Sequence, residues 1–210
     1  MKPTERHRSL VAATAALALA AVMITACSFT SREAHFYLLT PTIAAAAQDH
    51  STASSAGRSI GLGPVRLPAY LDRPQIVSVS GGSAVRLHDD HRWAAPLASE
   101  LPQVLAENLA ALLENDRVLV PPWPAGTAPD LQVSVEIIRF HALAGDVSAF
   151  LWARWTVSAA EGDASRPRSG SIRLSQPAPS LSIAGTVSAQ SLLLAELSRR
   201  IAADLKAMAR

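Results

Sequence analysis

The sequence predicts an α+β fold, a mostly antiparallel sheet with two amphipathic helices packed on one face. Apolar and polar residues alternate over residues 131–137, as in a half-buried strand. Apolar residues recur at steps of three and four over 97–112 and again over 193–208, as in helices with one apolar stripe. If these helices packed only on each other, the apolar face of the sheet would stay exposed, so we expect both on that face. The strand order does not follow from the sequence.

Residues 1–26 are predicted to be a lipoprotein signal peptide, because three basic side chains precede a short apolar run over 10–26. The run ends in Ile24-Thr25-Ala26-Cys27, which resembles the lipobox of bacterial lipoproteins. The resemblance implies cleavage before Cys27 and a lipid anchor of fatty acyl chains such as palmitate. Ser28 replaces the aspartate associated with inner-membrane retention, so we expect the outer membrane, periplasmic face. The alternative is an uncleaved inner-membrane anchor.

The mature chain is expected to be a lipidated tether over 27–34 and a single domain over 35–210. Its first element is an edge strand over 35–40, ended by Pro41. Residues 42–58 are rich in Ala, Ser and Thr and are predicted to form a flexible loop.

The next elements are a strand over 59–67 and a hairpin. Gly61, Gly63 and Pro64 predict a bend or bulge in the strand. Residues 75–79 and 85–88 are expected to pair around Gly81-Gly82, a turn pair that suits positive φ.

The first helix is expected to follow with Asp89 or Asp90 as its N-cap, Pro96 in its first turn and Asn115-Asp116 at its end. Pro102 predicts either that the regular helix begins near it or that the helix is kinked there.

The second half of the chain is expected to hold most of the sheet. Residues 117–120 predict a short strand, and Gly145-Asp146 a turn before a long strand over 147–159. The odd-numbered residues of that strand form an apolar face, but Phe150 and Trp152 lie on the other. We therefore expect part of that opposite face to be covered and look for a partner surface near Trp152. Ile172 and Leu174 suggest one further strand.

Charge and cysteine content exclude several classes of protein. The formal net charge of +2 comes entirely from the signal peptide, and the remainder carries sixteen basic and sixteen acidic side chains. A nucleic-acid-binding protein needs a basic stripe, so no nucleic-acid partner is expected. Because Cys27 is the single cysteine, an internal disulfide is excluded.

Catalytic and metal-binding patterns are weak. His88-Asp89-Asp90-His91 has metal-ligand residue types at close spacing, but it also fits a polar connector between a strand and a helix. No second cluster obviously completes a coordination sphere, so no metal or cofactor is expected. The sequence lacks a Gly-x-Ser-x-Gly elbow, a P-loop and a dinucleotide fingerprint, so we do not expect an enzyme. The tryptophans, at 93, 123, 152 and 155, suit a core, a rim or a lipid groove.

One segment is not explained by periodicity, the run Gly63-Pro64-Val65-Arg66-Leu67-Pro68-Ala69-Tyr70-Leu71-Asp72-Arg73-Pro74-Gln75-Ile76-Val77. It is similar to the signature of the PqiC family, the auxiliary lipoproteins of ABC-type, MCE-linked transport systems. A second match is Arg92-Trp93-Ala94-Ala95-Pro96-Leu97, continuing through residues 104–109. The family usually has an acidic residue at the position of Ala95, which is one departure.

The resemblance implies a non-enzymatic subunit of an intermembrane lipid transport system. This subunit docks a periplasmic MCE-domain protein at the outer membrane and supports membrane integrity. The candidate partner-binding residues are Pro68, Tyr70, Leu71, Asp72, Arg73, Arg92, Trp93 and Trp152. The alternative for the first segment is that Tyr70 and Leu71 fill the core while Asp72 and Arg73 pair locally.

Two other functions stay open. One is a periplasmic carrier that holds phospholipid in a groove between sheet and helices. The other is a metal-dependent enzyme built on His88 and His91. Whether the protein contacts lipid directly or forms a homo-oligomer does not follow from the sequence.

Overall fold

The computed structural model describes residues 33–43, 57–114, 116–123, 128–143, 147–159 and 166–208. The predicted signal peptide, Cys27, most of the tether, residues 44–56 of the predicted loop, Asn115 and the Gly145-Asp146 turn lie outside these ranges. Residues 34–210 form one compact unit.

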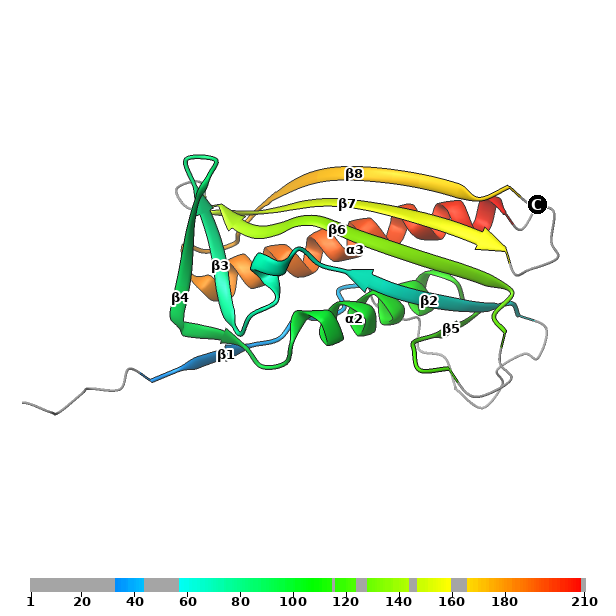
Figure 1. Cartoon of the computed structure of the whole chain (residues 1–210), viewed down its shortest axis with the longest axis horizontal. Helices are drawn as coiled ribbons and strands as arrows, with labels where there is room; N and C mark the ends of the chain where they lie inside the picture. Colours follow the sequence, from blue (N-terminus) through cyan, green and yellow to red (C-terminus); the bar gives the residue numbers. More distant parts are fainter. Residues whose placement is uncertain are drawn as a thin grey trace, which may run out of the picture. The chain divides into compact units, whose positions relative to one another are not determined.

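The fold is a mixed sheet with two long helices on one of its faces, as predicted (Figure 1). Most of its paired residues lie in antiparallel ladders. The strands are β1 (His35–Tyr37), β2 (Ser59–Arg66), β3 (Gln75–Ser80), β4 (Ala84–Trp93), β5 (Arg117–Leu119), β6 (Leu131–Leu143), β7 (Ser148–Ala159) and β8 (Arg168–Pro177). The helices are α2 (Leu97–Leu112), α3 (Ile183–Ala207) and the short 3-10 turn η2 (Ala69–Leu71).

Strand β6 organises the sheet. Its partner along one edge is β7, which pairs antiparallel with it and then with β8. The other edge of β6 is shared, because β2 pairs in parallel with its first half and β3 with its end at Ala142 and Leu143. Beyond β3 come β4 and then β1, and beyond β2 comes β5. The antiparallel pairs join neighbours in sequence, whereas each parallel pair joins strands that are far apart in the chain.

The hairpin of β3 and β4 turns at Gly81 and Gly82, whose φ angles of 56° and 81° confirm the prediction. The expected connector over 88–91 is wrong. These four residues belong to β4, which continues to Trp93 and pairs there in parallel with β1. Accordingly α2 begins after Pro96, without a side-chain cap from Asp89 or Asp90.

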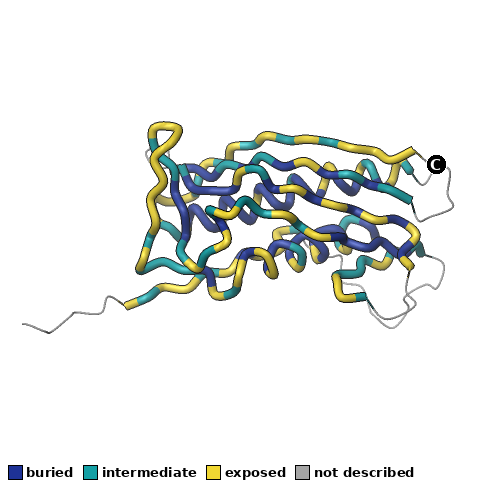
Figure 2. The backbone as a smooth tube through the Cα atoms, in the orientation of Figure 1, coloured by how far each residue is buried: buried dark blue, intermediate teal, exposed yellow. Residues whose placement is uncertain are grey.

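The core lies between the sheet and the helices (Figure 2). The odd-numbered residues of β7 from 149 to 157 are buried, as predicted. They face the apolar stripe of α3, which includes the fully buried Leu194 and Leu197. Leu101 and Leu105 of α2 are fully buried in the same core, where α2 packs on α3 and on β2. Helix α2 runs through Pro102 and ends at Leu112, close to the predicted end. Helix α3 starts earlier than its apolar pattern suggested, at Ile183, where the Ser182 side chain caps it.

Residues 38–43 form an extended strap that hydrogen bonds to both helices. The backbone N–H groups of Leu39, Thr40 and Ile43 donate to side chains of Glu100, Ser191 and Asn108, at 2.6, 3.1 and 3.2 Å. The predicted edge strand thus ends at Tyr37, and the chain then leaves the sheet for the helices. The strap follows β1, which itself follows the predicted tether, so β1 and the strap together fix where the tether joins the domain.

Candidate docking site

The segment Gly63–Val77 spans a gap along one edge of β6. Strand β2 ends opposite Glu136, and β3 pairs with β6 only from Ala142 onward. Between them η2 is closed by a hydrogen bond from the Leu71 N–H to the Pro68 carbonyl, at 3.0 Å. A register shift between Leu62 and Val65 confirms the predicted irregularity at Gly63 and Pro64.

Tyr70 and Leu71 point into the protein. Leu71 is 2% exposed and belongs to the core, and Tyr70 is half-buried against it. The Tyr70 hydroxyl lies 3.4 Å from Nδ1 of His141, a buried histidine on β6. Burial raises the pKa of Tyr70 and lowers the pKa of His141. Of the candidate contact residues in this segment, Leu71 therefore takes the alternative role in the core, and its side chain is not available to a partner.

The two segments that resemble the PqiC signature meet in space. The Trp93 N–H donates to the Pro74 carbonyl at 2.7 Å, and the Ala94 N–H donates to the Tyr37 carbonyl at 2.8 Å. These bonds close a pocket of about 350 Å³ next to the end of β1. It is lined by Asp72, Arg73, Pro74, Trp93, Ala94, Ala95 and Pro96. Two sequence motifs that are separated by residues 78–91 thus build one site, which we call the signature pocket.

In the signature pocket, Arg73 has an unsatisfied hydrogen-bond donor. Its Nε is buried and has no acceptor among the described residues. Asp72 is exposed beside it, and Ala95, where the resembling family usually has an acidic residue, lines the same pocket. A buried donor without an acceptor is costly.

The remaining predicted contact residues divide between this site and another face. Trp93 is 5% exposed and contributes a buried wall of the signature pocket rather than a free contact surface. Arg92 donates from Nε to the Asp89 carbonyl at 3.0 Å. Trp152 is not part of the pocket. It lies on the face of the sheet opposite the helices, with the Arg173 guanidinium 4.0 Å from its ring centre.

The histidines proposed as metal ligands are engaged in joining β1, β3 and β4. The Tyr37 hydroxyl lies 2.7 Å from Nδ1 of His91, and the Ser78 hydroxyl lies 3.0 Å from Nε2 of His88. The His91 ring also stacks on His35, with ring centres 5.2 Å apart. Within the described ranges no three His, Cys, Asp or Glu side chains are placed to hold a metal ion.

The family model for the ABC-type transport auxiliary lipoprotein component matches residues 37–202. The chain belongs to this family. Membership makes it a lipoprotein that assists a transport system, and the match includes both walls of the signature pocket. The described part of this auxiliary lipoprotein holds no helix that is both long and apolar enough to cross a bilayer.

Solved structures support the fold of this auxiliary lipoprotein. A crystal structure of an uncharacterized protein has a TM-score of 0.66 and 19% identity, covering 82% of this chain and 99% of its own. Protein XCC0632 from Xanthomonas campestris has a TM-score of 0.58 and 14% identity, covering 80% of this chain and 92% of its own. No curated protein sequence matches at a significant level.

Sequence reasoning missed two groups of residues. The strap acceptors Glu100 and Asn108 lie on buried turns of α2, and a charged residue one turn after Leu97 on the apolar stripe was an available signal. The second group is the arginines around Trp152, namely Arg139, Arg154 and Arg173. They were missed because they lie on three different strands, β6, β7 and β8, and only the register of the sheet brings them together.

Proposed function

We propose that this auxiliary lipoprotein is a non-enzymatic docking subunit of an MCE- and ABC-type intermembrane lipid transport system. It is anchored through Cys27 in the outer membrane, on the periplasmic face, and binds the periplasmic MCE-domain protein. The family and the PqiC-like segments support the transport system, and the Cys27 lipobox and Ser28 support the location.

The observation that carries the docking role is the signature pocket. It unites both resembling segments, has a buried arginine donor without an acceptor, and adjoins the strand that follows the predicted tether. A partner held there sits close to the anchored end of the domain. We expect an acidic side chain of the MCE-domain protein to pair with the Arg73 guanidinium in the pocket, and charge pairing of this kind gives an interface its specificity.

A structural rather than catalytic role agrees with the chemistry of the described residues. The His88 and His91 nitrogens that are engaged with Ser78 and Tyr37 serve contacts between strands. The main gain from such a subunit is a high local concentration of its partner at the membrane surface.

The test is co-purification from native membranes with a tag on the C-terminus of the full-length protein. Ala94 is exposed on the rim of the signature pocket, and Ala110 is exposed on α2, away from it. We expect the wild type and Ala110→Arg to retain an MCE-domain protein and Ala94→Arg to lose it. Equal recovery with both variants would remove the pocket from the interface, and recovery of no MCE-domain protein with the wild type would contradict the docking role.

The carrier function remains the second candidate because of one groove. A hollow of about 580 Å³ lies where α3 meets β8, and its lining includes Trp155, Ile172, Leu174 and Ala203. Arg173, Arg200 and Asp204 also border this hollow, so it offers apolar contacts for an acyl chain beside charged groups. Purified protein without a partner but with phospholipid in a fixed ratio, lost in Ala203→Glu, would favour the carrier over the docking subunit.

A further inference from the structure

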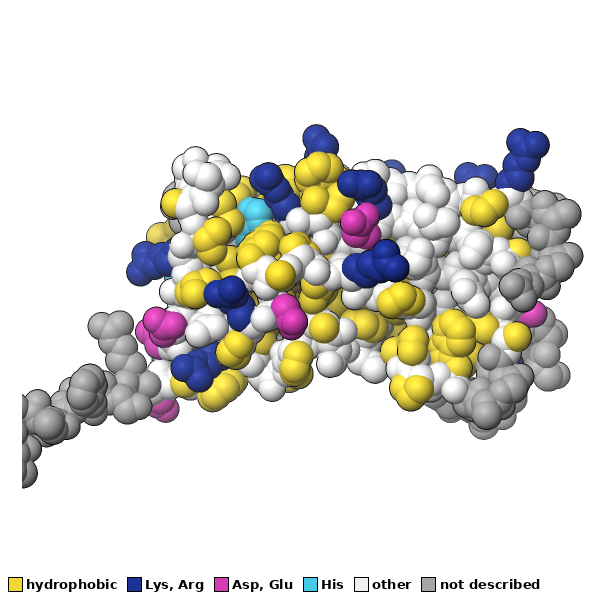
Figure 3. Space-filling view, viewed as in Figure 1, with side chains coloured by type: hydrophobic (Ala, Val, Ile, Leu, Met, Phe, Trp, Pro, Cys, Tyr) yellow, Lys and Arg dark blue, Asp and Glu magenta, His cyan; other side chains and the backbone are white. Residues whose placement is uncertain are grey.

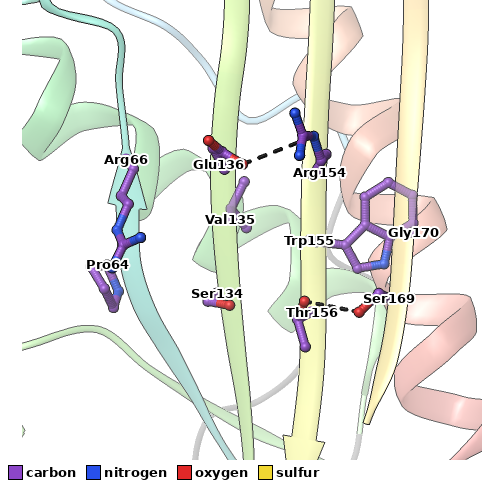
Figure 4. A pocket seen from close by; sticks show the side chains of 10 residues that line it. All are labelled: Pro64, Arg66, Ser134, Val135, Glu136, Arg154, Trp155, Thr156, Ser169 and Gly170. Carbon is purple, nitrogen blue, oxygen red and sulfur yellow. Dashed lines mark hydrogen bonds and ion pairs between the residues drawn. The ribbon is translucent and has the colours of Figure 1, made fainter.

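The face of the sheet opposite the helices is not uniformly polar. Arg66, Arg139, Arg154 and Arg173 lie on this open face, on β2, β6, β7 and β8. The acidic residue on these four strands is Glu136. Figure 4 shows Glu136 beside Arg154 on the neighbouring strand; their closest N and O atoms are 3.9 Å apart and both side chains are more than half exposed. Such a pair is weak, so the face keeps its positive charge.

The other arginines are available for an external anion. Arg66, Arg139 and Arg173 form no ion pair with any residue that the structure describes. Arg139 and Arg173 flank Trp152 on the two neighbouring strands, and the Arg173 guanidinium lies over the indole ring. Beside them is a shallow hollow of about 380 Å³ that is edged by Arg66 and by the hydroxyl groups of Ser134, Thr156 and Ser169 (Figure 4).

Exposed aliphatic side chains continue this face onto the hairpin. Val85 and Leu87 of β4 are 53% and 37% exposed. Val85 is directly opposite Val79, which is directly opposite Leu143, and Leu143 lies two and four residues after His141 and Arg139 on β6. Since paired residues share a face and alternate residues along a strand return to it, Val85 and Leu87 share the face of Arg139. Figure 3 shows Lys and Arg side chains among hydrophobic ones over this side of the molecule.

We infer that this open-face patch, comprising Val85, Leu87, Arg139, Trp152, Arg154 and Arg173, rests on an anionic phospholipid bilayer surface. Arginine, tryptophan and protruding aliphatic side chains in one surface match the charge, the interface and the acyl boundary of such a bilayer. The bilayer that holds the Cys27 lipid is within reach of the domain, because the predicted tether between them is short. Residues 28–34 can extend over at most about 25 Å between Cys27 and β1.

Exposed hydrophobic side chains near the tether favour the same orientation. Six large hydrophobic side chains are exposed in the described residues, and four of them lie on β1, directly after it, or on β4. These are Phe36, Leu38, Val85 and Leu87. The inference rests on the lipid anchor and not on the MCE-domain partner, so the two can fail separately.

The test uses the full-length lipoprotein, in which Cys27 is the single cysteine and, as proposed above, carries the lipid. The variant Ser175→Cys, at an exposed position on the open face, is labelled with an environment-sensitive fluorophore. The control variant is Ser188→Cys, at an exposed position on α3. Both proteins are reconstituted in phosphatidylcholine vesicles with or without phosphatidylglycerol. We expect a blue shift at position 175 that needs phosphatidylglycerol and reverses in high salt, and no shift at position 188.

Charge reversal then tests the arginines. Arg139→Glu with Arg173→Glu should abolish the shift at position 175, whereas Arg199→Glu with Arg200→Glu, the matched change on α3, should leave it intact. If the variant with both Arg139→Glu and Arg173→Glu does not fold, the test rests on whether high salt reverses the shift at position 175 in the protein that keeps both arginines. The inference is overturned by an equal shift without phosphatidylglycerol, by an equal shift at position 188, or by shielding of position 175 only when an MCE-domain protein is added.

Discussion

The Leu39 backbone N–H donates to Oε1 of Glu100 across 2.6 Å, and this buried bond ties the strap after β1 to helix α2. Oε2 of the same carboxyl has no partner among the described residues. Glu100→Ala removes the acceptor, and we expect it to lower the free energy of unfolding by about 1–3 kcal/mol. Urea denaturation measures the loss. The exposed neighbour Ser99→Ala serves as the control, and an equal effect there would contradict the role of the bond.

Glu100 should also make stability depend on pH. Burial raises the pKa of its carboxyl above the ordinary 4.5, although the Leu39 N–H partly offsets this. Because the folded state then holds the proton more tightly, the stabilisation is fully present below pH 4.5 and is lost as pH rises through the raised pKa. Glu100→Gln keeps an acceptor and cannot ionise, so we expect its unfolding free energy to be flatter above pH 4.5 than that of the wild type. An equal pH dependence of the unfolding free energy in the wild type and in Glu100→Gln would contradict the role given to the Glu100 carboxyl.

His141 is expected to give the opposite dependence on pH. Its burial on β6, with a smaller contribution from the Arg139 charge, lowers its pKa below 6.5. The neutral ring is therefore favoured in the folded state, and its contribution to stability is present above pH 6.5 and lost as pH falls through the lowered pKa. Thermal melts of His141→Gln should show less acid destabilisation than the wild type, by at most about 1.4 kcal/mol per pH unit.

His88 is expected to contribute to the same loss of stability at acid pH. Its pKa is also lowered, mainly by burial and then by the Arg86 charge. The double variant His88→Gln/His141→Gln should consequently lose more of the acid sensitivity than either single variant. If the double variant lost as much stability at acid pH as the wild type, groups other than these two histidines would have to cause that loss.

The Trp155 indole N–H donates to Oδ2 of Asp204 at 2.8 Å and so joins the central sheet to α3. Asp204 also pairs with Arg168 on β8, at 3.2 Å. A double-mutant cycle of Trp155→Phe and Asp204→Ala should give a coupling energy of about 0.5–3 kcal/mol, measured by chemical denaturation. Additive effects would mean that this bond does not contribute to the packing of the helix.

Gly170 is required because the Trp155 ring covers it. A Cβ at this position on β8 would overlap the indole, which has little room to move while it is bonded to Asp204. We expect Gly170→Ala to destabilise the protein by about 1–3 kcal/mol. Ser175→Ala, exposed on the same strand, is the matched substitution, and similar melting temperatures for the two variants would refute the steric argument.

Ala95→Glu tests the unmet donor of the signature pocket. A carboxylate at this position shares the pocket with Arg73, and an ion pair there should add up to about 1 kcal/mol of stability. The gain should vanish in an Arg73→Gln background. A gain that survives that background would have to come from another contact.

Local patterns predicted most of the elements and much of the core. Alternation placed β6 and the buried face of β7, helical spacing placed the stripes of α2 and α3, and Gly81-Gly82 placed the hairpin. The candidate site was only partly predictable. Asp72 and Arg73 do line a pocket, but Leu71 and Trp93 are buried, and Trp152 belongs to a different face.

What the sequence by itself determined is therefore what neighbouring residues decide together: periodicity, turns and the two family-like segments. The tertiary structure alone decided the strand order, the addition of β1 beside β4, and the meeting of Pro74 with Trp93. The physical reason is that a strand's face follows from its own alternation, whereas its partner is selected by contacts distant in sequence. Both the signature pocket and the open-face patch arise from such contacts.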